Sequence, residues 1–348
     1  MEWTVAVGVD THKAVHVAVA LDRLGCLLGS CAVEAAVPGY EQLYGWASSL
    51  GVSVFAIEGA ASYGAGLARF LRERGLPVFE SERPSRRDRR GGKNDCVDAE
   101  LAARRLLAGN GLSELRGGGV RELLRVLLLE RRSADQARTA CLNQLHALAV
   151  TAPPPLRARL AGRNRARLAV TAARLRARAS DDLEQRALIE VIRRLGARAN
   201  ALADELAASE RSIDELVRAV APDLLDECGV GPICAAQLIV SSGERGRMRS
   251  EAAFAALAGT SPVEASSGPT RRHRLNRGGD RQLNAALHRI ALTRTRFHPE
   301  TAAYHQRLLA RGKSKREALR CIKRMLARHL YPRLRAIPSL ELTQRANT

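Results

Sequence analysis

The chain has 348 residues, with 56 Lys and Arg against 36 Asp and Glu, so its formal net charge is +20. Since 46% of the residues are hydrophobic, the chain can bury sizeable cores, and the excess charge does not indicate disorder. Two Trp, five Tyr and five Phe argue against a protein that works mainly by stacking single-stranded bases. No run approaches the ~20 apolar residues of a membrane span, and acidic Glu2 follows Met1, so we expect no membrane segment and no signal peptide.

The seven cysteines form no CxxC pair and no Cys/His spacing typical of zinc. We therefore interpret them as reduced thiols of a cytosolic protein. The length predicts two or three domains, at roughly 100–200 residues each. A basic protein of this kind is expected to have a polyanion as its partner.

The basic residues are concentrated toward the carboxyl-terminal end. Residues 1–80 hold five basic and eight acidic side chains, a net charge of −3. Residues 266–348 hold 20 basic and four acidic side chains, a net charge of +16. An acidic first segment and a basic last segment favour a catalytic or metal-binding region joined to a nucleic-acid-binding region. The alternative is a solvated basic face that binds nothing.

The first 80 residues predict an α/β layer with a mixed sheet. Five runs rich in apolar residues predict strands, at 3–9, 14–21, 26–34, 52–58 and 76–80. Two helices are expected between these strands, one beginning at Pro38 and one over 63–74. This order of strands and helices is typical of layered α/β folds.

The rest of the chain predicts helices. After a basic loop at 83–93, one helix is expected to begin near Asn94 and a longer one to cover 119–149, before a run of three prolines. Ten positions of the next segment alternate in steps of four and three: Leu188, Ile192, Leu195, Ala199, Leu202, Leu206, Ser209, Ile213, Leu216 and Val220. This coiled-coil pattern predicts either a helical hairpin within the chain or an arm for self-association.

Four carboxylates fall at the ends of predicted elements. Asp10 ends the first strand in GVDTHK, and Glu58 ends the fourth in IEG. Asp95 and Asp98 are three residues apart at a helix start, so both project from one face. Singly, each residue also suits a turn or a helix terminus. Together they predict one acidic cluster at a sheet edge that holds Mg²⁺, in two ions, with Mn²⁺ able to substitute.

Two distant parts of the sequence contain recognisable motifs. The first part runs from GVDTHKAVHVAVALDRLG to KNDCVDAE. The second contains CGVGPICAAQLIV, FAALAGTSPVEASSGPTRRHRLNRGGDRQLNAALHRIAL and GKSKREALRCIKRMLARHLY. In these motifs the sequence resembles the DEDD transposases of bacterial insertion sequences of the IS-one-ten class, and the resemblance covers nearly the whole chain in the same order.

The resemblance implies an α/β plus α fold in three parts. These are a RuvC-like (RNase H-like) domain at 1–150, a coiled-coil segment at 151–221 and a mostly helical transposase domain at 222–348. It assigns catalysis and metal binding to Asp10, Glu58, Asp95 and Asp98.

The resemblance also implies a serine nucleophile and a basic surface in the last part. The serine corresponds to Ser267, with Ser266 as the adjacent alternative. Forked guanidinium groups and ammonium groups suit phosphate binding. The residues expected to contact nucleic acid are Arg271, Arg272, Arg274, Arg277, Arg281, Lys313 and Lys315.

The function implied by the resemblance is metal-assisted, serine-dependent DNA strand exchange that excises and inserts an element through a covalent phosphoserine intermediate. The expected partners are double-stranded DNA of the element and its target, a structured guide RNA and further copies of the chain in a dimer or tetramer. The expected location is the bacterial cytoplasm, at the nucleoid. The alternatives are a RuvC-type nuclease or Holliday-junction resolvase that uses water, and a nucleic-acid-binding protein without catalysis.

Overall fold

The computed structural model describes residues 3–83, 94–115, 119–243, 248–264, 273–274, 276 and 278–337. By its internal contacts the chain divides into two compact units, Met1–Gly117 and Gly118–Thr348. This division precedes the long helix that the sequence predicts at 119–149, so that helix belongs to the second unit. The functional division at 150 and 221 stays a prediction. No helix in the described ranges is long and apolar enough to cross a membrane.

The first unit is built on a six-stranded mixed sheet, which confirms the predicted α/β layer. Its strands are β1 (Val5–Thr11), β2 (Val15–Asp22), β3 (Leu27–Glu34), β4 (Ser53–Glu58), β5 (Val78–Ser81) and β6 (Leu112–Glu114). Their order in the sheet is β3-β2-β1-β4-β5-β6. β1 pairs parallel with β4, and β4 pairs parallel with β5, whereas β2, β3 and β6 join their neighbours antiparallel. The carboxyl ends of β1, β4 and β5 therefore lie at one edge.

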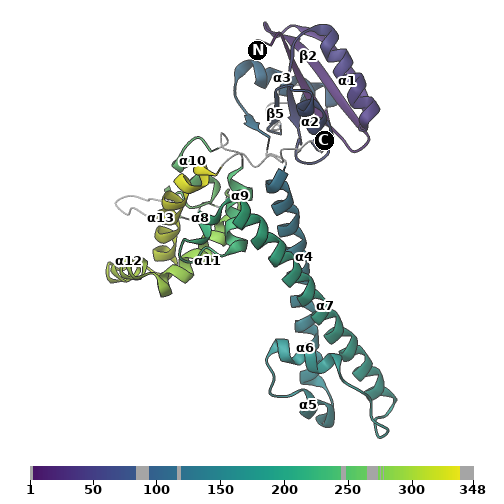
Figure 1. Ribbon diagram of the computed structural model, residues 1–348, viewed down its shortest axis with the longest axis vertical. Coiled ribbons are helices and arrows are strands. Elements are labelled where there is room, and N and C mark those ends of the chain that lie inside the picture. Colours follow the sequence, from purple (N-terminus) through teal and green to yellow (C-terminus); the bar gives the residue numbers. More distant parts are fainter. Residues whose placement is uncertain are drawn as a thin grey trace. The chain divides into compact units, whose positions relative to one another are not determined.

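Helices cover both faces of this sheet (Figure 1). α1 (Val37–Leu50) and α2 (Ala65–Glu73) pack on the face formed by alternate residues of β1 such as Val7. α3 (Asp95–Ala108) packs on the opposite face, where Ala6 and Ala56 meet Ala102. Both faces of the central strands are thus buried, which explains their continuous apolar runs.

The crossing of α3 over β1 depends on a glycine. A Cβ on Gly8 would collide with the carbonyl oxygen of Ala99 and the amide nitrogen of Ala103. The start of α3 is fixed by Asn94, whose side chain accepts a hydrogen bond from the amide of Cys96 at 3.0 Å. Close packing and a defined cap together hold the first turn of α3 over the end of β1.

The second unit contains a long antiparallel helix pair. α4 (Gly119–Thr151) and α7 (Leu183–Val220) lie side by side in Figure 1. The start of α4 meets the end of α7, as shown by the ion pair between Arg131 Nη2 and Glu210 Oε1 at 2.6 Å. The helices α5 (Pro154–Leu160) and α6 (Arg165–Ala173) complete a core at the other end of the pair.

The coiled-coil pattern of α7 faces helices of the same chain. Ile192 and Ala199 are buried in the core shared with α4 and α6, and Ile213 is buried against Leu124 and Leu128 of α4. The structure therefore has the intramolecular hairpin, one of the two arrangements that the pattern predicts. Self-association stays a prediction.

The remainder of the second unit is mostly helical. It comprises α8 (Pro222–Leu225), α9 (Pro232–Ser242), α10 (Glu251–Leu257), β7 (Val263–Glu264), β8 (His273–Arg274), α11 (Arg281–Phe297), α12 (Pro299–Ala310) and α13 (Lys315–Ala336). Leu238, Phe254, Leu287 and Leu326 from four of these helices are fully buried in one core. The predominance of helix after the sheet confirms the predicted α/β plus α organisation.

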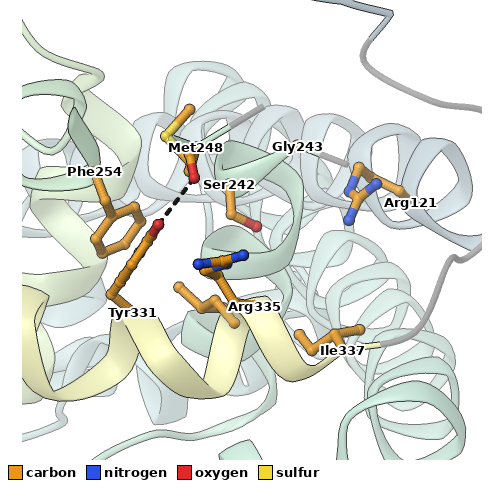
Figure 2. Close-up of a pocket in the computed structure, with 9 residues that line it drawn as sticks. Arg121, Ser242, Gly243, Met248, Phe254, Tyr331, Arg335 and Ile337 are labelled. Atoms are coloured by element: carbon orange, nitrogen blue, oxygen red, sulfur yellow. Dashed lines mark hydrogen bonds between the residues drawn. The ribbon is translucent and has the colours of Figure 1, made fainter. Parts of the chain in front are cut away.

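A polar contact and a small void lie where this core meets α4. Figure 2 shows the Tyr331 hydroxyl donating a hydrogen bond to the carbonyl oxygen of Met248, at 2.9 Å. The void beside them, lined also by Arg121 and Phe254, measures about 10 Å³. This is roughly the space of one water molecule.

Candidate active site

Asp10 and Glu58 lie side by side at the carboxyl edge of the sheet. The parallel register of β1 and β4 pairs Val9 with Ile57, so the next residues along the two strands are Asp10 and Glu58. Because side chains alternate along a strand, Asp10 shares the face of Ala6 and Gly8, beneath α3. Glu58 shares the same face. The neighbouring positions of Asp10 and Glu58 thus follow directly from the strand register.

Asp95 and Asp98 occupy the first turn of α3 above this edge. Asp98 is buried, with 3% of its surface exposed, whereas the side chain of Asp95 is about half exposed. A helix start favours negative charge, because its amide groups and dipole are positive there. The fold therefore tolerates two acids at this position while it directs them toward Asp10.

His12 joins the acidic cluster. Its Nδ1 lies 3.8 Å from Asp10 Oδ2, and its Nε2 lies 3.9 Å from Asp95 Oδ1. One potential ligand atom from each of Asp10, His12 and Asp95 falls within 4.8 Å of the others. Sequence reasoning missed His12, although its place two residues after a strand-terminal aspartate in GVDTHK was a usable signal.

The electrostatics of the cluster suit a cation. Burial raises the pKa of the Asp10 carboxyl, and the negative charges of Asp95 and Asp98 raise it further, against the opposing effect of His12. Carboxylates that repel one another in a partly buried site are stabilised by a divalent ion. Their oxygens are the ligands that Mg²⁺ prefers, and the imidazole of His12 adds a donor that Mn²⁺ accepts readily. The donor set therefore fits a divalent metal.

Glu58 has additional contacts that hold it in place. Its Oε1 accepts a hydrogen bond from Arg83 Nε at 3.1 Å, and its backbone carbonyl accepts one from the Thr11 hydroxyl at 2.6 Å. The hydrogen bond from Thr11 connects the end of β4 to the residue that follows Asp10. The side chain of Arg83 is 82% exposed, so its guanidinium can exchange this carboxylate for a phosphate group.

Part of the predicted nucleic-acid surface can be located in the second unit. Arg274 lies on β8, Arg281 begins α11, Lys313 precedes α13 and Lys315 begins it, and all four are exposed. Arg274 and Lys313 line the same cavity, whereas Arg281 and Lys315 do not line it. The remaining predicted residues lie outside the described ranges: Ser266, Ser267, Arg271, Arg272 and Arg277.

Two transposase family models match separate parts of the chain. Residues 7–154 match a DEDD transposase model of the IS110 type, and residues 224–306 match the model described as "Transposase IS116/IS110/IS902 family". The first match includes all four acids and His12, and the second includes Ser266 and Ser267.

A relative with a similar sequence comes from Streptomyces coelicolor. It is the uncharacterized 43.6 kDa protein of insertion element IS110, and it is 32% identical to this chain over 148 residues. The aligned region covers 42% of this chain and 36% of the relative.

Proposed function

The chain belongs to the IS110 family of transposases, and from this membership we propose that it catalyses the DNA strand exchange that excises and inserts a mobile element. The observation that carries the proposal is the acidic cluster of the first unit. Asp10 and Glu58 end neighbouring parallel strands, and the first turn of α3 brings Asp95 and Asp98 to the same edge. The sheet order and this cluster support an RNase H-like, RuvC-like assignment of the first unit.

In this proposal Asp10, Glu58, Asp95 and Asp98 hold divalent metal, with Mg²⁺ as the expected ion, two ions as the expected number and Mn²⁺ as a substitute. When bound, the metal supplies positive charge that lowers the energy of phosphoryl transfer. His12 lies between Asp10 and Asp95, so it either orients their carboxylates or binds the same metal through a ring nitrogen. Arg83 neutralises charge beside Glu58 and is available to a DNA phosphate.

The proposed nucleophile is Ser267, with Ser266 as the neighbouring alternative. Its Oγ attacks a backbone phosphorus, the bond from phosphorus to the leaving deoxyribose oxygen breaks, and a serine phosphodiester forms while the leaving oxygen gains a proton. A serine hydroxyl needs activation for this step, since it is largely protonated at neutral pH. The carboxylates and the serine belong to different units of the chain, so the proposal requires the two units to act on one DNA strand.

The proposed partners are the DNA of the element and of its target, a structured guide RNA and other copies of the chain in a dimer or tetramer. Basic residues of the second unit would hold phosphates, including Arg271, Arg272, Arg274, Arg277, Arg281, Lys313 and Lys315. Backbone contacts of this kind carry no base specificity, so an RNA that pairs with DNA would choose the sites.

The proposal is tested with purified protein, a plasmid that carries the element's ends, and RNA transcribed from its flanks. In Mg²⁺ the wild type should cleave the ends and form a protein–DNA adduct that survives denaturation. Asp10→Asn should abolish both products, whereas Glu100→Gln should retain them, because Glu100 on α3 pairs with Arg104 along the helix. Cleavage by Asp10→Asn at the wild-type rate would refute the proposed site.

A second candidate is a metal-dependent nuclease or junction resolvase that uses water. The observation in its favour is that the acidic cluster lies entirely within the first unit. Paired Ser267→Ala and Ser266→Ala variants separate the two functions. Strand exchange predicts that one of them abolishes the adduct, whereas a water-dependent nuclease predicts cleavage without an adduct in both variants and in the wild type.

A further inference from the structure

A cationic cavity of about 430 Å³ lies in the second unit between α13 and the segment that follows α10. Among the residues that the structure describes, six basic side chains line it: Arg274, Lys313, Arg320, Lys323, Arg324 and Arg328. Four of them come from α13, where Arg320, Arg324 and Arg328 recur every four residues and so form one ridge. The opposite wall is formed by residues 259–262 and by Arg274 and Asn276.

Lys323 is the most buried of these cations, with 7% of its surface exposed. Its Nζ donates a hydrogen bond to Asn284 Oδ1 at 2.8 Å. An ammonium group has three donors, so this fixed contact leaves capacity for an anion. Burial and the nearby charge of Arg320 lower the pKa of Lys323, and a bound anion would oppose that effect. The fold therefore holds a desolvated cation at the cavity wall.

Acidic residues offset only part of the positive charge. Among the described residues, Glu317 lies 3.8 Å from Arg320, and Glu251 pairs with both Arg324 and Arg328. Two carboxylates thus accompany six cations. Guanidinium and ammonium groups at several points of one cavity suit an anion whose charges are spaced along a chain, rather than a single small ion.

The volume and the position of the cavity limit the kind of ligand that fits it. Cavities of ~300–1,000 Å³ bind small molecules, so this one accommodates a single nucleotide unit and not a double helix. Its opposite wall contains residues on both sides of the 265–272 interval in which Ser266 and Ser267 fall. We propose that the cavity binds one phosphate and its nucleoside in an unpaired stretch of the DNA strand. This inference rests on the proposed function, since it concerns the same substrate.

Cys321 provides a direct reporter, because it lines the cavity and is partly exposed. The full chain is labelled with a maleimide in the absence of divalent metal, with and without short oligothymidylate, and each cysteine is quantified by peptide mass spectrometry. Bound oligothymidylate should slow labelling of Cys321 at least about tenfold, which is equivalent to a free-energy difference of ~1.4 kcal/mol. Cys228 of the same unit is also partly exposed but does not line the cavity, so its labelling should not change.

Variants of the lining residues test whether their positive charges bind the oligothymidylate. Arg320→Gln and Lys323→Met should each weaken oligothymidylate binding about tenfold and reduce the slope of log affinity against log salt by about 0.7. Arg211→Gln, an exposed arginine on α7, should leave both quantities unchanged. If Lys323→Met fails to fold, as judged by circular dichroism, Arg320→Gln and the labelling of wild-type Cys321 still decide the question.

Three results would overturn the assignment. Oligothymidylate that binds without protecting Cys321 would place the strand elsewhere, while cleavage and adduct formation could still succeed. Equal protection by a blunt duplex would exclude an unpaired strand as the specific occupant. Protection by oligouridylate and not by oligothymidylate would identify RNA instead of DNA. Failure of the proposed function is recognised separately, as absence of metal-dependent cleavage despite normal protection of Cys321.

Discussion

His12 Nε2 lies 3.9 Å from Asp95 Oδ1, although the histidine follows a strand and the aspartate begins a helix far along the chain. The other ring nitrogen of His12 lies 3.8 Å from Asp10. An imidazole between two carboxylates can orient both or bind the same metal through a nitrogen. The acidic cluster of the first unit is therefore expected to contain a nitrogen donor.

Replacement of His12 should weaken metal binding and remove a nitrogen signal. In His12→Ala, Mn²⁺ affinity measured by calorimetry should fall about 10–100-fold, as for the loss of an orienting or ligating group. If His12 is a ligand, pulsed electron paramagnetic resonance of Mn²⁺-bound wild type should show coupling to ¹⁴N, and the variant should lack it. His146→Ala, an exposed residue on α4, is the control. Unchanged Mn²⁺ affinity in His12→Ala would exclude both roles.

Asp10→Asn should raise the melting temperature of the metal-free protein and abolish its response to Mg²⁺. Burial first, and the charges of Asp95 and Asp98 next, raise the pKa of Asp10 above its ordinary value of 3.8. A carboxyl with a raised pKa opposes folding increasingly as the pH rises from its ordinary pKa to its raised pKa in the folded protein. The higher melting temperature of Asp10→Asn should therefore be seen at neutral pH and vanish in acid. Each kcal/mol gained corresponds to roughly 2–4 °C.

The control for Asp10→Asn is Glu41→Gln, on the exposed surface of α1. Differential scanning fluorimetry in a chelator and in Mg²⁺ measures both effects. A metal-free variant that melts below the wild type at neutral pH would show that Asp10 stabilises the fold, contrary to this account.

The sequence was sufficient to place the acids but not all of their neighbours. Asp10 and Glu58 were predictable because each ends an apolar run, and parallel strands bring such ends to one edge. The contact between Arg83 and Glu58 could not be predicted from the sequence, because it depends on the path of the chain after β5. The three-residue β6 is too short to have a periodicity.

The pattern of α7 shows a second limit of sequence reasoning. A repeat of four and three residues identifies a buried face but not the helix that covers it. The covering helices are α4, whose sequence contains buried Leu124, Leu128 and Leu145, and α6, which packs on α7 at the other end of the pair. Since an intramolecular and an intermolecular partner present the same apolar surface, only the folded chain distinguishes them.

Leu202→Asp should therefore destabilise the protein instead of only dissociating an oligomer. Leu202 is partly buried against the core that α7 shares with α4 and α6. Burial of a carboxylate there should lower the free energy of unfolding by at least about 2 kcal/mol. Urea denaturation measures this loss, and light scattering measures the mass. A lower mass with unchanged stability would instead show that α7 is a self-association seam.

Gly8→Ala should separate α3 from the sheet and weaken the metal site from a distance. The added methyl group would collide with the backbone of α3 at Ala99, and relief by helix movement should cost about 1–3 kcal/mol. Because Asp95 and Asp98 move with α3, Mn²⁺ affinity should fall as well. Gly45→Ala on α1, where a Cβ meets nothing within 4 Å, should be neutral or stabilising. Full Mn²⁺ affinity in folded Gly8→Ala would refute this coupling.

Glu227 should make the stability of the second unit depend on pH. Its carboxylate contacts Arg294 Nη1 at 3.1 Å, His329 Nε2 at 2.8 Å and Arg333 Nη2 at 2.6 Å. Burial, the largest effect, raises the pKa of Glu227, but the contacts with His329, Arg333 and Arg294 outweigh it and lower the pKa below 4.5. A carboxyl with a lowered pKa contributes stability above pH 4.5, and this contribution is lost as pH falls through the folded value.

Glu227→Gln should therefore destabilise the protein at neutral pH by about 3–5 kcal/mol, because Arg294, only 7% exposed, loses its carboxylate. Urea denaturation measures the difference from wild type at neutral pH and again well below pH 4.5, where protonation of Glu227 should shrink it. Glu300→Gln, an exposed glutamate at the start of α12, is the matched control at both pH values. A difference that is equally large in acid would mean that Glu227 acts through packing and not through its charge.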